Sequence, residues 1–272
     1  MLKRPGILIP VFFLSLVHAT VASQVQWPEA ASAALGGSFV CTQGYMCASQ
    51  NQAGLGFIEQ SSVSLQHALP YLIKELGISS FSGQFSSGSG ALGLALFTQG
   101  LQGFRQSSLW LSYGLRLHSN LSAGMGIHLW NSTITEQLIY APGISFALGL
   151  QIKINEQWIL GTRLFHPTAW SSQTDLSKDQ LMTIEAGFSY SFFRVAQIYS
   201  ELHIKPETSL ILCSGLEWIL NQQIRLRTGI CSQPFTFSWG ISLGFTKWVA
   251  EFAFQYRTDT GLSPLTSLTH AW

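Results

Sequence analysis

Residues 213–231, CSGLEWILNQQIRLRTGIC, read almost the same from both ends. If the chain folds back at Gln222, Glu217 meets Arg227 across two strands, and two glycines and two cysteines meet in the same way. Successive side chains of a strand point to opposite faces, so one face is mostly apolar and the other carries these pairs. The stretch therefore predicts an antiparallel hairpin with a three-residue turn, belonging either to a soluble sandwich or to a membrane barrel.

The same alternation recurs along the chain, most clearly at residues 109–129, 144–164, 182–204 and 235–256. Extended to the whole sequence, it predicts about fourteen strands. They lie near residues 57–69, 76–86, 91–99, 106–117, 121–131, 142–154, 157–166, 181–193, 195–204, 208–220, 224–231, 235–245, 248–257 and 265–272. The last strand is predicted to be short.

Short connections such as HSN and NQQ alternate with longer ones such as HPTAWSSQTDLSKDQ. An even strand number, with short turns at one rim and long loops at the other, is typical of bacterial outer-membrane barrels. Charged residues are only 10% of the chain, whereas soluble domains have roughly 25%. We therefore expect an all-β fold, an antiparallel transmembrane β-barrel over residues 57–272. A soluble exported β-protein that binds a ligand is the alternative.

Residues 1–23 combine a basic start, a short apolar run and small residues at the end, which is the pattern of a secretory signal peptide. The remaining chain is close to neutral and has no basic patch, so we expect no nucleic acid partner. The expected location is the bacterial outer membrane, with both termini periplasmic. The expected partners are outer-membrane lipid and the barrel assembly machinery, for which Trp272 is a plausible terminal signal.

All four cysteines lie outside the signal peptide, and an even number in an exported chain favours disulfides. The hairpin register pairs Cys213 with Cys231, and a local Cys41–Cys47 bond is a second candidate. The sequence has no CxxC motif and no histidines clustered near the cysteines, so we predict neither a metal site nor a cofactor.

Eight charged residues fall on polar faces of the predicted strands and form a candidate polar network in the lumen. They are Arg116, Arg163, Glu185, Glu201, Glu217, Arg225, Arg227 and Glu251. The Glu217–Arg227 pair is interpreted as a structural ion pair, with a polar gate or a plug anchor as the alternative. Without HExxH or a phosphate loop, we do not expect an enzyme.

Residues 24–56 do not alternate and are rich in small residues, including ALGGSFV and NQAGL. These segments, with Gly215, Glu217 and Trp218 in the hairpin, resemble the FadL/PorV-like outer-membrane barrels, most closely the PorV/PorQ-like proteins of Bacteroidota. Gln52 stands where that family usually has proline. The candidate plug motif consists of Gly36, Gly37, Asn51, Ala53, Gly54 and Leu55.

The resemblance implies that residues 24–56 form a plug or hatch in the lumen. It also implies one of two functions: transport of hydrophobic molecules across the outer membrane, or service in type IX secretion. The corresponding partners are a hydrophobic ligand or components of the secretion system. An open, nonspecific pore is a further alternative, which a plug would disfavour.

Overall fold

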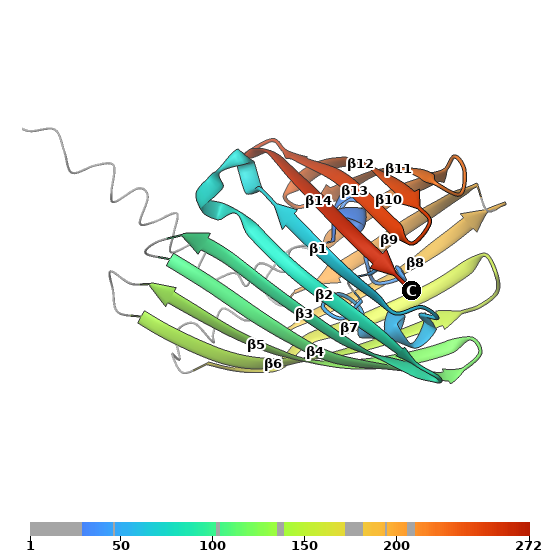
Figure 1. Ribbon diagram of the computed structural model, residues 1–272, viewed down its shortest axis with the longest axis horizontal. Helices are drawn as coiled ribbons and strands as arrows, with labels where there is room; N and C mark the ends of the chain where they lie inside the picture. Colours follow the sequence, from blue (N-terminus) through green and yellow to red (C-terminus); the bar gives the residue numbers. More distant parts are fainter. Residues whose placement is uncertain are drawn as a thin grey trace, which may run out of the picture.

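The computed structural model describes residues 29–45, 47–101, 104–134, 139–171, 182–193, 195–205 and 210–272; the expected signal peptide lies outside them. Fourteen antiparallel strands close into one barrel, in which β1 pairs with β14 (Figure 1). The strands are β1 (Ser62–Ala68), β2 (Ile78–Ser87), β3 (Gly90–Leu101), β4 (Phe104–His118), β5 (Leu121–Ile134), β6 (Ile139–Lys153), β7 (Trp158–Ser171), β8 (Thr183–Phe192), β9 (Ala196–Ile204), β10 (Ile211–Ile219), β11 (Ile224–Ser232), β12 (Phe235–Phe245), β13 (Trp248–Arg257) and β14 (Gly261–Ala271). The predicted all-β barrel is confirmed.

The described part of the chain also contains four short helical elements: α2 (Ala30–Ala34), η1 (Gln52–Phe57), η2 (Pro70–Leu72) and η3 (Lys74–Leu76). The first two precede β1, and the last two lie between β1 and β2. Among the described residues, no helix is long and apolar enough to cross a membrane.

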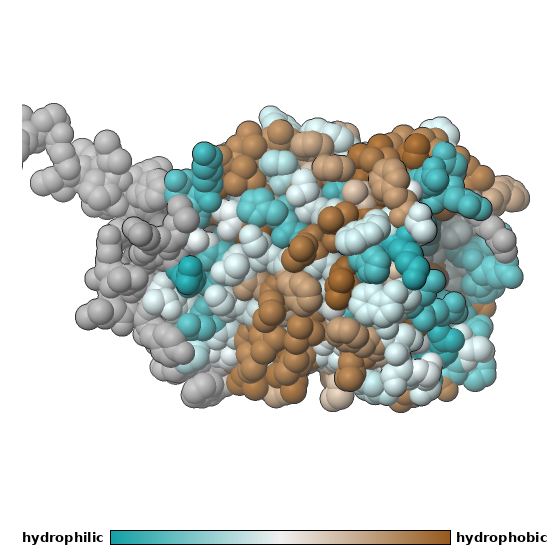
Figure 2. Space-filling view, in the orientation of Figure 1, coloured by the Kyte–Doolittle hydropathy of each residue, from teal (hydrophilic) through white to brown (hydrophobic). Residues whose placement is uncertain are grey.

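The two faces of the barrel wall reverse the usual distribution of polarity. Large apolar side chains such as Leu65, Leu92 and Met125 point outward and are 61%, 57% and 59% exposed. Polar side chains point inward, and Gln84 and Arg163 are each only 1% exposed. Figure 2 shows large apolar residues on the outer face, with hydrophilic residues mainly toward the ends of the barrel. A water-exposed wall of this kind is unfavourable, whereas a lipid-exposed one is expected.

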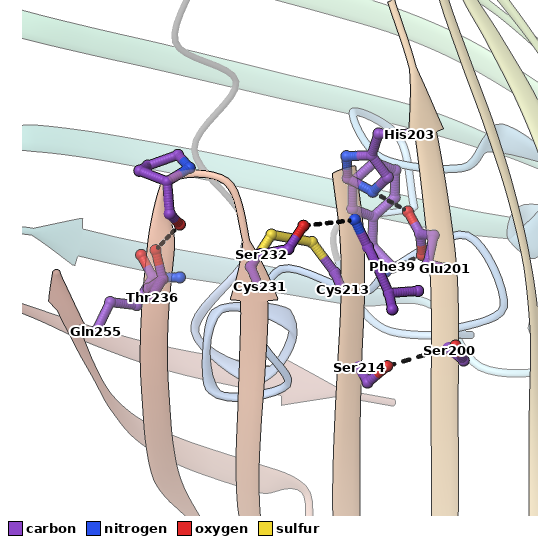
Figure 3. The surroundings of a disulfide bond; sticks show 12 residues. Phe39, Ser200, Glu201, His203, Cys213, Ser214, Cys231, Ser232, Thr236 and Gln255 are labelled. Atoms are coloured by element: carbon purple, nitrogen blue, oxygen red, sulfur yellow. Dashed lines mark hydrogen bonds and ion pairs between the residues drawn. A yellow bond between two sulfur atoms is a disulfide. The ribbon is translucent and has the colours of Figure 1, made fainter. Parts of the chain in front are cut away.

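The predicted register of the mirrored hairpin is confirmed. Strands β10 and β11 pair Glu217 with Arg227 and Cys213 with Cys231, and both pairs lie on the inner face. The two cysteines form a disulfide across the strands (Figure 3). A one-residue slip would turn the guanidinium of Arg227 toward the apolar outer face, which explains why this register is strongly specified.

Several expected loops are in fact strand. β3 runs to Leu101 and β4 begins at Phe104, inside the expected loop TQGLQGFRQ. β5 and β6 extend in the same way to Ile134 and from Ile139, and β7 continues to Ser171. The prediction stopped early because outward positions near this rim are small or polar. Backbone pairing continues there without an apolar side chain to reveal it.

The predicted start of the first strand, at residue 57, is wrong. Asn51 instead caps the start of the 3-10 helix η1, because its side-chain oxygen accepts a hydrogen bond from the Ala53 amide at 3.1 Å. Phe57 ends this helix as a buried residue, with the Lys153 ammonium 4.0 Å from the centre of its ring. Phe57 therefore belongs to the interior, and β1 begins only at Ser62.

The closing strand is longer than expected. β14 spans Gly261–Ala271 and pairs with both β13 and β1. Pro264 lies within this strand, although proline cannot donate to a strand ladder. Here the ladder between β14 and β1 ends at Leu265, one residue away, and the Pro264 carbonyl accepts a hydrogen bond from the Leu69 amide at 2.9 Å.

The N-terminal segment, defined here as residues 29–57 without Met46, lies inside the barrel (Figure 1). Val40, Ala53 and Leu55 are 0% exposed, although the segment contributes no strand. Its helix α2 lies against β11–β14, and η1 lies against β3–β6. The segment therefore crosses the lumen from one wall to the other.

Glycines on the inner face of the wall make room for this segment. A Cβ atom at Gly161 would lie 2.6 Å from the Val40 carbonyl oxygen, and one at Gly215 would lie 2.7 Å from Leu35 Cβ. The same close approach occurs on other strands, at Gly93, Gly114, Gly124, Gly149, Gly229 and Gly240. The glycines on the polar faces of the strands thus mark where the N-terminal segment packs against the wall.

We predict that Gly114→Ala destabilises the protein by disturbing this contact. Its Cβ would lie 2.5 Å from the Gln52 carbonyl oxygen, and overpacking of this kind costs about 1–3 kcal/mol. The midpoint of thermal unfolding in detergent should fall. Gly244→Ala is the matched control, because its Cβ has no neighbour closer than 3.7 Å. Equal midpoints for the two variants would mean that the segment does not rest on this wall.

Candidate functional site

The lumen is the candidate functional site, and three buried charges form its most compact ionic cluster. Arg227 Nε donates to Glu217 Oε2 at 2.6 Å, and Arg227 Nη1 donates to Glu251 Oε1 at 2.9 Å. The Ser267 hydroxyl donates to the second oxygen of Glu251 at 3.1 Å. The predicted Glu217–Arg227 ion pair is therefore present. It is one of the two ion pairs in a triad that joins β10, β11 and β13.

Arg225 does not join this triad. It is exposed and lines a polar cavity of about 370 Å³ that the triad also lines. None of the ion pairs found among the described residues includes it. The cavity opens beside the short turn at residues 220–223 and is covered on one side by part of the N-terminal segment.

Other charges of the predicted network hold the N-terminal segment. Glu201 Oε2 accepts hydrogen bonds from the amides of Phe39 and Val40, both at 2.8 Å. The other oxygen of Glu201 lies 2.7 Å from His203 Nε2, and Figure 3 shows this group beside the disulfide. Glu201 thus binds two backbone N–H groups of the segment with one fully buried carboxylate.

Two arginines also hold the segment, Arg163 from β7 and Arg116 from β4. Arg163 Nη1 pairs with Glu185 at 2.9 Å, and its Nη2 donates to the Ser49 carbonyl at 3.1 Å. Arg116 Nε donates to the Gly56 carbonyl at 2.9 Å. Arg116, Arg163 and Glu201 therefore anchor the N-terminal segment, a role that the sequence analysis had raised only for the Glu217–Arg227 pair.

Uncharged side chains complete the attachment. Gln151 Nε2 donates to the Val40 carbonyl at 2.7 Å, and the Ser122 hydroxyl donates to the Ala53 carbonyl at 2.6 Å. Within the segment, Asn51 Nδ2 donates to the Val40 carbonyl at 2.6 Å. These contacts satisfy backbone groups of a segment that has little secondary structure of its own, as a buried chain requires.

The residues of the candidate plug motif occupy this buried contact. Gly36 and Gly37 have φ values of +74° and +89°, which disfavour other residue types. Gly54 lies against Cys47, where an added Cβ would approach the thiol sulfur to 2.6 Å. Sequence resemblance located these positions, and the structure supplies the steric reason for the glycines.

The expected Cys41–Cys47 disulfide is wrong, because both residues are buried free thiols. Cys41 Sγ lies 3.6 Å from the Ile159 carbonyl, and Cys47 Sγ lies 3.0 Å from the Gly44 carbonyl. The two sulfurs therefore contact different partners. Burial raises the pKa of both thiols, and the Glu201 carboxylate raises that of Cys41 further. Both thiols stay protonated and serve as packing groups.

Beyond the segment, toward the rim opposite the short turns, the lumen becomes aromatic. This aromatic cluster consists of Trp110 from β4, His128 and Trp130 from β5, and Phe165 and His166 from β7. The rings of Trp110 and His128 are stacked with centroids 4.3 Å apart, and those of Trp110 and Phe165 are 5.4 Å apart. Ser145 Oγ contacts His166 Nδ1 in a short hydrogen bond.

Sequence reasoning gave this cluster no role, although a signal was present. Trp110 lies two residues from Ser112 on β4, and Trp130 lies two residues from His128 on β5, so each tryptophan shares the polar face of its strand. The lumen is therefore asymmetric: aromatic on one side of the N-terminal segment and polar on the other. Aromatic contacts are therefore concentrated on one side of the segment only.

Comparison with solved structures supports the fold. The toluene transporter TbuX of Ralstonia pickettii has a TM-score of 0.70 at 11% identity, with 92% of this chain and 99% of that chain covered. The toluene transporter TodX of P. putida has a TM-score of 0.66 at 11% identity, covering 89% of this chain and 97% of that one. A Pseudomonas aeruginosa FadL homologue has a TM-score of 0.64 at 11% identity, covering 91% and 98%.

No family model matches the sequence, and the search of curated proteins found no match. At these identities the likeness defines the fold alone. The molecule is a closed fourteen-strand barrel whose lumen holds its own N-terminal segment. Its fold is that of TbuX, TodX and the FadL homologue.

We predict that Glu201→Gln loosens the segment. Hydrogen bonds to a charged acceptor are worth about 1.5–3 kcal/mol, and the amide keeps only part of this. A loss of 1–2 kcal/mol changes an opening equilibrium by about 5–30-fold. The amides of Phe39 and Val40 should exchange hydrogen faster by that factor, measured by mass spectrometry. Glu59→Gln, at an exposed position, is the control. Unchanged exchange in Glu201→Gln would show that another contact holds the segment.

Proposed function

We propose that this chain is an outer-membrane barrel that transports small hydrophobic molecules, with the N-terminal segment as a plug. The observation that carries the proposal is the aromatic cluster on one side of the N-terminal segment in the lumen. Aromatic rings offer stacking and edge-to-face contacts to an apolar ligand, each worth about 0.5–1.5 kcal/mol beyond burial. The cluster lies directly before the plug, where an entering molecule would stop.

Membrane location is supported by the apolar outer wall. Side chains such as Trp239, Phe252 and Leu216 are 39%, 42% and 38% exposed and would face lipid. The signal-peptide pattern at residues 1–23 and the fold shared with TbuX and TodX point the same way. A soluble ligand-binding protein would have to expose this surface to water.

The nature of the transported molecule is inferred from the cluster and from the titles of the similar structures. TbuX and TodX are described as toluene transporters, and CymD, also similar in fold, as a monoaromatic hydrocarbon channel. A molecule of that class would fit rings such as Trp110 and Phe165. The filled lumen argues against an open, nonspecific pore.

Service in type IX secretion, which the PorV/PorQ-like resemblance implied, stays a hypothesis. No contact among the described residues favours it over transport. The proposed orientation follows the sequence expectation, with the short turns and Trp272 in the periplasm. The aromatic side of the lumen would then face the cell exterior.

Uptake of radiolabelled toluene by a bacterial host tests the proposal. Cells that display the chain should take up toluene several-fold faster than cells with an empty vector. Trp110→Ala should remove most of this gain, since it removes the ring that contacts both His128 and Phe165. Trp239→Ala is the matched control, because this tryptophan faces outward. Equal uptake with and without the chain would refute the proposal.

A further inference from the structure

The outer wall of the barrel carries a hollow of about 700 Å³ over β1–β6. An apolar row crosses it, formed by side chains that neighbour one another on successive strands. The row consists of Leu65, Phe81, Leu96, Leu109 and Leu129. Leu65 and Leu96 are 61% and 43% exposed, and both would face lipid. An acyl chain lying across the wall would therefore cover this row.

A second row, polar but uncharged, lies two residues closer to the rim opposite the short turns. Its members Thr98, Ser107 and Asn131 are cross-strand neighbours. Ser79 continues the row, but its hydroxyl is already engaged, 3.1 Å from His67 Nδ1. The Asn131 side-chain oxygen is buried and accepts no hydrogen bond from the described residues. Because an unpaired buried acceptor is unfavourable, this oxygen calls for a donor at the depth of the polar row.

Two cations lie beyond the polar row, at the rim itself. Arg105 is exposed and lies two residues before Ser107 on the same face of β4, about 7 Å further along the strand. Lys74 is exposed in η3, which lies against β3 at the same end of the barrel (Figure 1). Glu75 follows Lys74 and offsets its charge, so Arg105 is the principal group for binding an anion.

The order of these rows restricts the class of lipid that fits. In a glycerophospholipid the groups between chain and phosphate are esters, which have no hydrogen to donate to Asn131. In an N-acylated glucosamine phosphate an amide N–H joins the acyl chain to the sugar, and the phosphate can occupy the adjacent ring carbon. The proposed orientation places this rim at the cell exterior, where the outer leaflet of an outer membrane presents lipids of the second class.

We infer that the hollow binds one acylated, phosphorylated glucosamine lipid of the lipid A class. An acyl chain lies along the apolar row, and its amide N–H donates to the Asn131 oxygen. The hydroxyls of Thr98 and Ser107 donate to acyl carbonyl oxygens. Arg105 pairs with the phosphate, for which guanidinium is a favoured side chain. The inference rests on the proposed membrane location and orientation and not on the proposed transport.

Native mass spectrometry of the full chain in mild detergent tests the site, with bisphosphorylated lipid A as the probe. We expect one lipid A to stay bound where phosphatidylglycerol, which is anionic but joined to its chains only by esters, does not. Arg105→Gln should weaken retention of lipid A about tenfold, because a charge-assisted contact with the phosphate is lost. Lys247→Gln, which removes an exposed cation at the opposite rim, is the matched control.

Two further variants test the rows themselves. Ser107→Phe fills the hollow and should abolish retention of lipid A. Ser214→Phe on β10 is its control, because this small side chain also faces outward but on the opposite wall. Asn131→Leu removes the acceptor at nearly constant size and should reduce the preference for lipid A over phosphatidylglycerol. Heat-modifiable migration on a gel shows that each variant is folded.

Either of two results would overturn the site. The first is that wild type retains phosphatidylglycerol as well as it retains lipid A, or better. The second is that Ser107→Phe, shown to be folded, retains lipid A as well as wild type does.

Discussion

Inside this barrel the backbone of the wall contacts the backbone of the N-terminal segment, and the rest of the lumen is arranged around that contact. The wall can approach the backbone of the N-terminal segment only where it has no side chain. At Gly114 and Gly161 even a methyl group would press on backbone or side-chain atoms of the segment. Glycine weakens a strand by roughly 0.5–1 kcal/mol relative to alanine. Its repeated use on inner positions therefore indicates that the space is occupied.

Buried charge follows from the same contact. A segment with little regular secondary structure presents unpaired N–H and C=O groups, and the wall supplies hydrogen-bond partners for them. The Glu201 carboxylate receives two amides, and Arg163 and Arg116 donate to carbonyls. Charges that do not bond to the segment pair with one another instead, as in the triad around Arg227. The inward-facing charges thus serve two purposes: some bind the segment, and others pair with one another. Alternation along a strand cannot distinguish the two.

Strand alternation was sufficient to predict the number of strands, their order and the register of β10 with β11. These features depend on period-two contacts that are local in the sequence. It failed where the local signal stops, as at the ends of β3, β4 and β5, where small and polar residues continue the ladder. It also failed at Phe57, an apolar residue that packs inside the lumen instead of beginning a strand.

The site was less accessible to sequence reasoning than the fold. Parity placed Glu217, Arg227 and Glu251 in the lumen, but their convergence on one guanidinium depends on the curvature of three strands. The pairing of Cys41 and Cys47 was wrong because short spacing says nothing about which way a thiol points in an irregular segment. The aromatic cluster combines residues of β4, β5 and β7, which are too far apart in the sequence for their contact to be predicted from it.

The proposed role of the N-terminal segment as a plug that closes the lumen is tested most directly by conductance across a planar bilayer. The full chain should conduct ions poorly, because its lumen is filled by residues such as Gln52 and Leu55, both 0% exposed. The same chain without residues 24–56 should insert as an open barrel with a conductance many times larger. Equal conductance of the two forms would contradict the account and place the barrier elsewhere.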